Sequence, residues 1–233
     1  MKTGSFAFLI VAVFAAEAFA EKRDVSFTAQ DGVALKGSFY SAPKAGPGVL
    51  LLHQCNADHR VYDNLATMLS AAGYNVLAFD FRGLGTIADK MAGDVEAAYG
   101  FLTSQPGVNS RAIGVVGGSC GANQAVHAAR RHPEIRTLVL LSGGTDVEGE
   151  AFIKGAPNLP ILGVASEEDT DAAALTLKLV SASPSSYSRM DMFKAAGHAA
   201  SMFERQPDLE ADIVIWFRKN LAIGGYGLPP AIR

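Results

Sequence analysis

Short apolar runs alternate along this chain with segments of helical periodicity, and this alternation constrains the fold more than any other feature. Residues 49–52 are uniformly apolar and lead into His53, which is typical of a strand covered on both faces. Residues 60–72 then carry apolar side chains at helical spacing. The cycle recurs, with strands expected at 75–81, 113–116, 137–141, 161–165 and 187–193 and helices at 90–103, 121–131, 171–180 and 208–221. Such repeated strand–helix units predict an α/β fold with a mostly parallel sheet and helices on both faces.

A hairpin is expected ahead of these units, because residues 25–29 and 33–40 flank the turn dipeptide Asp31-Gly32. No internal repeat or low-complexity tract divides the chain. Only residues 142–159 separate the expected strands 137–141 and 161–165. The sequence therefore predicts one domain with an open, shallow site and little or no lid.

The first twenty residues have the pattern of a secretory signal peptide. Lys2 precedes an apolar run of eleven residues, Phe6–Ala16, and Ala18-Phe19-Ala20 offers small residues at a cleavage site. A membrane anchor would need about 18 apolar residues. We therefore expect residues 1–20 to be removed after Ala20, no membrane span, and a secreted or periplasmic domain over residues 21–233.

Composition excludes several classes of function. Apolar residues make up 49% of the chain and charged residues 18%, as in soluble globular proteins. The net charge of −3 supplies no basic field for a phosphate backbone, so nucleic acid is not an expected partner. Two cysteines cannot form a disulfide framework or a four-thiolate zinc site, and His59 shows no metal spacing with acidic partners. No metal or organic cofactor is implied, and the oligomeric state stays open.

The segment Gly117-Gly118-Ser119-Cys120-Gly121 joins an expected strand to an expected helix. In that context G-x-S-x-G is a nucleophile elbow, in which a strained serine projects above the sheet. The flanking glycines are needed because a β-carbon would collide with the neighbouring strand or helix. A simple glycine-rich turn with an inert serine is one alternative. Cys120 as nucleophile is another, but it shifts the elbow by one residue and loses the glycine two positions earlier. Ser119 is the candidate nucleophile.

A serine nucleophile needs a base, and the base needs an orienting group. Glu167-Glu168-Asp169 follows the expected strand 161–165, and His198 follows the last strand. The chain order Ser119, Asp169, His198 suits an elbow of this kind. Taken singly, an acidic loop or a loop histidine indicates little, but together at strand ends they favour a catalytic triad. Glu168 is the alternative acid.

The oxyanion of an acyl-transfer transition state needs backbone N–H donors. One is expected from Cys120, the residue after the nucleophile, and the second from the loop after the first parallel strand. That loop reads His53-Gln54-Cys55. Gln54 and Cys55 both remain candidates for the second donor. His53, at the end of a buried strand, is expected to bond the loop rather than act as a base.

Together these segments resemble the α/β-hydrolase superfamily, in particular its small secreted or dienelactone-hydrolase-like members. The resemblance covers residues 24–221 and rests on the strand ending in His53, residues 77–85, the elbow 117–121 and the loops of Asp169 and His198. It implies an eight-stranded sheet and a serine-hydrolase triad. The chain departs from the family pattern twice, with His-Gln-Cys in place of His-Gly in the oxyanion loop and serine where dienelactone hydrolases proper have cysteine.

Two further expectations concern neighbours of the elbow. Cys55 and Cys120 lie on neighbouring strands if the family strand order holds, and the mature domain would enter an oxidising compartment. We hypothesise a disulfide that braces the oxyanion hole, with two buried free thiols as the alternative. Asp80 is expected to tie down the loop at Arg82-Gly83.

The sequence thus predicts a serine hydrolase that cleaves a carboxylic ester, or a related acyl bond, of a small molecule through an acyl-enzyme. Among enzymes, a peptidase or a thioesterase is the alternative. A noncatalytic binding protein on the same fold is the alternative from another class, because fold does not determine function.

Overall fold

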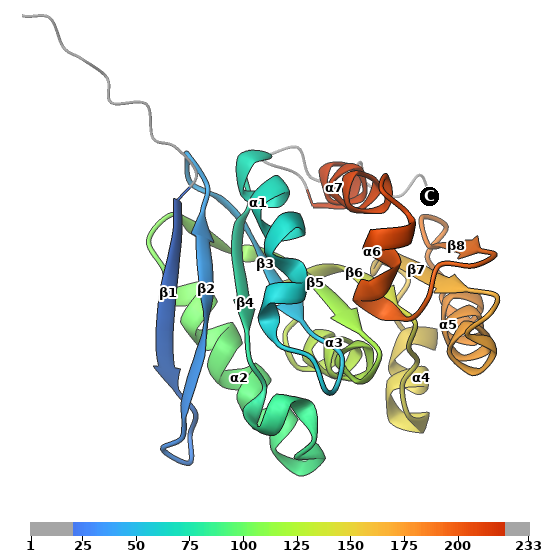
Figure 1. Cartoon of the computed structure of the whole chain (residues 1–233), viewed down its shortest axis with the longest axis horizontal. Coiled ribbons are helices and arrows are strands. Elements are labelled where there is room, and N and C mark those ends of the chain that lie inside the picture. The colour runs from blue at the N-terminus through green and yellow to red at the C-terminus, as the bar shows by residue number, and fades with distance from the viewer. Residues whose placement is uncertain (1–20, 222–233) are drawn as a thin grey trace, which may run out of the picture.

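A computed structural model describes residues 21–221, so the expected signal peptide at 1–20 and the end of the chain at 222–233 lie outside the described residues. Its centre is an eight-stranded sheet in the order β1-β2-β4-β3-β5-β6-β7-β8 (Figure 1). Only the β1–β2 and β2–β4 pairs are antiparallel, and the other neighbours are parallel. The expected α/β fold with a mostly parallel sheet is confirmed. The strands are β1 (Glu21–Thr28), β2 (Ala34–Ser41), β3 (Gly46–Leu52), β4 (Asn75–Phe79), β5 (Val108–Gly118), β6 (Ile135–Leu141), β7 (Ile161–Ser166) and β8 (Arg189–Phe193).

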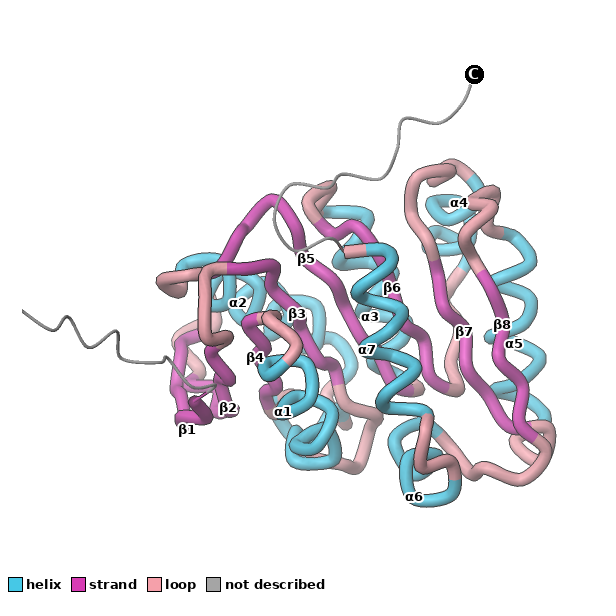
Figure 2. Tube along the Cα trace, turned by 90° about the horizontal axis from the view of Figure 1, so that it is seen from above, coloured by secondary structure: helices cyan, strands magenta, loops and turns pink. Residues whose placement is uncertain are grey.

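Helices cover both faces of the sheet, whose edge strands β1 and β8 lie at opposite ends (Figure 2). One face packs against α1 (Asp63–Ala71), α6 (Met202–Arg205) and α7 (Leu209–Asn220). The other packs against α2 (Ala88–Ser104), α3 (Cys120–Arg131), α4 (Val147–Lys154) and α5 (Thr170–Ala182). Short 3-10 turns lie at His59–Tyr62, Arg82–Gly85 and Ala199–Ser201.

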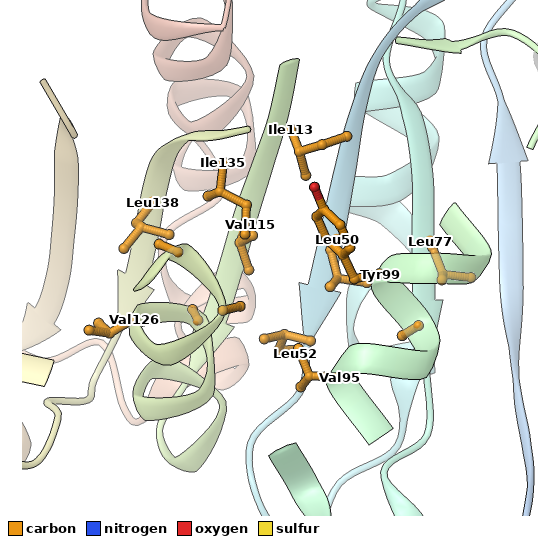
Figure 3. Close-up of a cluster of buried hydrophobic side chains, with 14 of the residues drawn as sticks. Leu50, Leu52, Leu77, Val95, Tyr99, Ile113, Val115, Val126, Ile135 and Leu138 are labelled. Atoms are coloured by element: carbon orange, nitrogen blue, oxygen red, sulfur yellow. The ribbon is translucent and has the colours of Figure 1, made fainter. Parts of the chain in front are cut away.

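Strand β3 shows why its sequence is apolar without alternation. Successive side chains of a strand point to opposite faces. Val49 and Leu51 pack among the helices of one face, and Leu50 and Leu52 pack against Val95 of α2 on the other (Figure 3). All five side chains are fully buried. A central parallel strand therefore needs apolar residues at every position.

Between β6 and β7 the chain forms only α4, an eight-residue helix that packs beside α3 and α5. Sequence periodicity missed this helix, because it is short and its Val147 is exposed. Asp146 starts α4 by accepting a hydrogen bond from the Gly149 backbone N–H. Residues 142–160 connect the two strands, and α4 is the one helix that they form. Within residues 21–221, no helix has the length and apolar character needed to cross a bilayer.

Candidate active site

Ser119 occupies the sharp turn between β5 and α3. Its backbone has φ 51° and ψ −116°, a conformation disfavoured for any residue with a β-carbon. Its N–H donates to the Leu141 carbonyl at 2.8 Å, which holds the turn against β6. Strain of this kind persists only where the surrounding structure imposes it, and it clusters at functional sites. The Ser119 side chain is thereby presented at the carboxyl edge of the sheet.

The glycines on either side of Ser119 leave no room for side chains. A β-carbon on Gly117 would overlap the Gly121 carbonyl oxygen at the start of α3. A β-carbon on Gly121 would overlap the Leu52 carbonyl oxygen in β3. These are the collisions with helix and strand that the motif predicts, and they explain the glycine spacing.

His198 and Asp169 form a close pair. His198 Nδ1 lies 2.6 Å from Asp169 Oδ2. A carboxylate accepts hydrogen bonds, so Nδ1 carries the proton and Nε2 is left as the basic nitrogen. Glu168 does not reach the imidazole, because its Oε1 accepts hydrogen bonds from the Gly197 N–H and Arg205 Nη1, each at 2.8 Å. Asp169 therefore has the orienting position, and Glu168 holds the adjacent loop.

The three residues converge on one cavity of about 490 Å³ at the carboxyl edge of the sheet. Ser119, Asp169 and His198 all line it, together with Asn123 and the loop 142–146. Ser119 Oγ and His198 Nε2, both in the described part of the chain, are not hydrogen-bonded to each other. Nucleophile–base bonds are often long without substrate and tighten when it binds. The cavity brings together the three side chains that the sequence predicts as a triad.

Polar side chains at the ends of β3, β6 and β7 hold the backbone of the histidine loop, residues 196–200. Gln54 Oε1, Ser142 Oγ and Ser166 Oγ accept N–H bonds from this loop at 3.4, 3.0 and 2.8 Å. Ser142 and Ser166 are almost completely buried. Sequence reasoning missed this role for both serines, although each directly follows an apolar strand at its carboxyl end.

Three backbone N–H groups are the expected candidates for an oxyanion hole. Among residues 21–221, the N–H groups of Cys120, Gln54 and Cys55 bond no backbone carbonyl. Cys120 is the first residue of α3, where N–H groups have no partner within the helix. Gln54 and Cys55 both stay candidates for the second donor.

A disulfide joins Cys55 to Cys120, with 5.9 Å between the Cα atoms. It links the loop after β3 to the first residue of α3, and Gly85 packs against it. A bonded sulfur is not a thiolate nucleophile, and the strained backbone falls on Ser119. These two facts favour Ser119 over Cys120 as the nucleophile.

His53 has a structural environment, as expected. Its Nε2 accepts the Phe81 N–H at 3.0 Å, so the ring proton lies on Nδ1 and is donated to the Gln54 carbonyl at 2.7 Å. Burial lowers the pKa of the His53 imidazole, which favours this neutral form. The residue ties the oxyanion loop to the segment after β4.

The prediction that Asp80 ties down the Arg82-Gly83 loop is wrong. Asp94, fully buried on α2, performs that role by accepting hydrogen bonds from the Arg82 N–H at 3.0 Å and Nε at 2.8 Å. The Asp80 carboxylate instead contacts His59, with Oδ1 2.8 Å from the backbone nitrogen of His59 and 2.7 Å from its ring Nδ1. Nothing local in the sequence connects Asp94 to residue 82, because the contact depends on how α2 packs.

In the part of the chain that the structure describes, potential metal ligands meet at one place that the sequence did not indicate. Asp58, His59 and Asp80 bring three such atoms within 4.8 Å of one another. Each already has a protein partner, since Asp58 pairs with Arg60 and Asp80 with His59. The cluster is satisfied by hydrogen bonds and ion pairs, and we assign no metal to it.

A strained Gly-x-Ser-x-Gly turn on a mostly parallel sheet, with a bonded carboxylate–histidine pair after later strands, is the arrangement typical of an α/β-hydrolase. Residues 43–166, more than half of the chain, match the family described as serine aminopeptidase, S33. The chain belongs to this family.

Curated relatives are similar over part of their length. An uncharacterized protein of Mycobacterium tuberculosis is 34% identical over 132 residues, which are 54% of this chain and 47% of that protein. A thiohydrolase of Aspergillus aculeatus is 30% identical over 126 residues, 50% of this chain and 40% of the thiohydrolase. The matches thus span less than half the length of these curated relatives.

Solved structures share the fold over most of the chain. A dienelactone hydrolase of Anabaena variabilis has a TM-score of 0.71 at 21% identity, covering 87% of this chain and 99% of its own. An esterase of Pyrococcus furiosus has a TM-score of 0.67 at 20% identity, covering 87% and 92%. The esterase domain of a Rhodothermus marinus protein has a TM-score of 0.71 at 19% identity, covering 86% and 100%. At such identities the likeness establishes the fold alone.

Proposed function

We propose that the protein is a serine hydrolase that cleaves a carboxylic ester, or a related acyl bond, of a small molecule through an acyl-enzyme. One observation carries the proposal: Ser119, on its strained turn, lines the same cavity as the bonded His198–Asp169 pair. Membership of a hydrolase family and a fold shared with esterases support the same class.

In the proposed reaction, Ser119 Oγ attacks the acyl carbon and its proton passes to His198 Nε2. Asp169 stabilises the imidazolium through the 2.6 Å contact with Nδ1. The bond to the leaving group breaks, and the leaving oxygen takes the proton from His198. Water then attacks the acyl-enzyme with His198 as base, which releases the acid and restores Ser119. The Cys120 N–H and that of Gln54 or Cys55 stabilise each oxyanion.

We also propose that the domain works in a secreted or periplasmic location after cleavage following Ala20. The Cys55–Cys120 disulfide supports this location, because structural disulfides persist in oxidising compartments and are rare in the cytosol. The intact mass and N-terminal sequence of the protein recovered outside the cytoplasm should show a chain that begins at Glu21. A recovered chain that still carries residues 1–20 would contradict the proposal.

The function is tested by labelling with a fluorophosphonate and by turnover of p-nitrophenyl acetate. Ser119→Ala should abolish both, whereas the matched control Ser181→Ala, at an exposed position of α5, should retain both. Undiminished labelling of Ser119→Ala would contradict the assignment. A folded native protein that neither labels nor turns over esters would favour the noncatalytic alternative.

A second panel separates the bond types. Ester, thioester and anilide substrates that share one acyl group should be compared by kcat/KM. The proposal expects the ester to be turned over, and faster than the anilide. A higher value for the anilide would favour a peptidase, and a higher value for the thioester a thioesterase.

A further inference from the structure

Asn123 lies one helical turn after the nucleophile and lines the same cavity. Side chains of a helix lean toward its N-terminus, which for α3 is the end next to Ser119. Asn123 and Ser119 thus line one cavity from neighbouring positions. The triad does not use the Asn123 amide.

The orientation of this amide is determined by its partners. Oδ1 accepts from Thr145 Oγ1 at 2.7 Å and faces the Asp146 backbone N–H at 3.3 Å. A backbone N–H can only donate, so the amide atom beside it is the oxygen and Nδ2 faces the other way. Among residues 21–221, no acceptor is hydrogen-bonded to Asn123 Nδ2. Asn123, a residue of the cavity wall, thus has an amide N–H donor without a partner among the described residues.

The segment that holds Asn123 is itself anchored. Asp146 contacts His127 Nε2 at 2.8 Å and accepts the Gly149 N–H at 2.9 Å. Asn123 and His127 are one turn apart on α3, so two positions of one helix hold the same loop. A donor held in this way loses little freedom when a substrate binds.

The charged side chains that line the cavity are all acidic: Asp146, Asp169 and Asp171, with no lysine or arginine of the described residues among them. The bond from Gly149, and then His127, lower the pKa of Asp146, so this group is anionic at neutral pH. Such a lining repels a carboxylate on the substrate. The partner that suits Asn123 Nδ2 is therefore a neutral oxygen.

We propose that Asn123 is a specificity-determining residue that donates a hydrogen bond from Nδ2 to a neutral oxygen on the acyl chain of the substrate. The acyl chain is the relevant part because it is bonded to Ser119 in the acyl-enzyme and so stays in the cavity after the leaving group has departed. The substrate class is an ester of an oxygenated acyl chain, with a keto, hydroxyl or ether oxygen, in preference to a plain alkyl or carboxylate-bearing chain. This inference rests on the proposed function.

The test compares p-nitrophenyl esters that share a leaving group. kcat/KM is measured for the keto chains 4-oxopentanoate and 5-oxohexanoate and for the alkyl chains pentanoate and hexanoate. The keto-to-alkyl ratio of the native protein is divided by that of each variant, which cancels intrinsic reactivity. Loss of one hydrogen bond predicts a quotient of about 3 to 10 for Asn123→Leu and for Asn123→Asp. The control Asn109→Leu lies at an exposed position near the start of β5, at the opposite end of the strand from Ser119, and should give a quotient of one.

Asn123→Asp separates recognition from loop support, because it keeps an oxygen that faces the Asp146 N–H and replaces the Nδ2 donor by a carboxylate oxygen. The negative charge that it adds acts on the keto and the alkyl ester alike, so the quotient reports the donor. A quotient of one for both Asn123 variants, or for Asn123→Asp alone, would overturn the inference. Circular dichroism of each variant checks the fold. If the native protein turns over none of the esters and Ser119 does not label, the proposed function fails and this inference with it. Turnover and labelling with unchanged quotients overturn the inference alone.

Discussion

Removal of the disulfide should produce a large and calculable loss of stability. Cys55 and Cys120 are separated by 65 residues, and a crosslink over a loop of that length lowers the entropy of the unfolded chain. The loop-entropy relation gives about 4 kcal/mol at 25 °C. For a domain of this size, that corresponds to a melting temperature lower by roughly 8–16 °C. The double variant Cys55→Ala/Cys120→Ala is the perturbation.

The assay is urea and thermal unfolding followed by circular dichroism without reductant. Dithiothreitol should bring the native protein to the stability of the double variant and leave the double variant unchanged. The free energies of unfolding of the native protein and the double variant, both measured without reductant, should therefore differ by several kcal/mol. A difference below about 1 kcal/mol would refute the reasoning. So would alkylation of both cysteines in the unreduced native protein.

The same variant tests whether the disulfide braces the oxyanion loop. If the disulfide keeps the second oxyanion donor, the N–H of Gln54 or Cys55, in place, removal of the disulfide should lower kcat. The upper limit is the loss of one oxyanion donor, about 10²- to 10³-fold. KM should change little, because the variant alters only Cys120 among the residues that line the cavity. An unchanged kcat at a temperature where both proteins are folded would limit the bond to a stabilising role.

Three further predictions follow from single contacts. Asp169→Asn should lower kcat about 10⁴-fold and Glu168→Gln less than tenfold, since only Asp169 contacts the base; equal losses would contradict the assignment. Gly121→Ala should destabilise the fold by roughly 3 kcal/mol or more, whereas Gly100→Ala, which has open space around it in α2, should stabilise by about 0.5–1 kcal/mol; urea midpoints decide. Burial lowers the pKa of the His53 imidazole below its ordinary value of 6.5, so the unfolded chain binds this proton before the folded chain does as the pH falls. The free energy of unfolding that this group contributes is therefore fully present above pH 6.5. It falls by about 1.4 kcal/mol per pH unit as the pH drops from there toward the pKa of the folded state. His53→Gln should remove that part of the pH dependence of unfolding, and an unchanged dependence would contradict it.

Local sequence patterns were sufficient to predict most of the fold and the turn at Ser119. The apolar run at 49–52 and the helical spacing at 60–72 each depend on residues close together in the chain, so they can be recognised from the sequence alone. The elbow is equally local, since Gly117 and Gly121 make room for a turn only five residues long. Chain order then pointed to Asp169 and His198, because parallel strands place their carboxyl ends at one edge.

The sequence by itself therefore determined the fold class, the turn that carries Ser119 and the approximate positions of its partners. Tertiary structure alone decided which of the adjacent Glu168 and Asp169 meets His198, and that Asp94 rather than Asp80 holds the Arg82 loop. It also brought Cys55 beside the elbow and tied Asn123 to the loop at 145–146. These contacts join segments far apart in the chain, and their geometry depends on strand order and helix packing, which no local pattern of residues records.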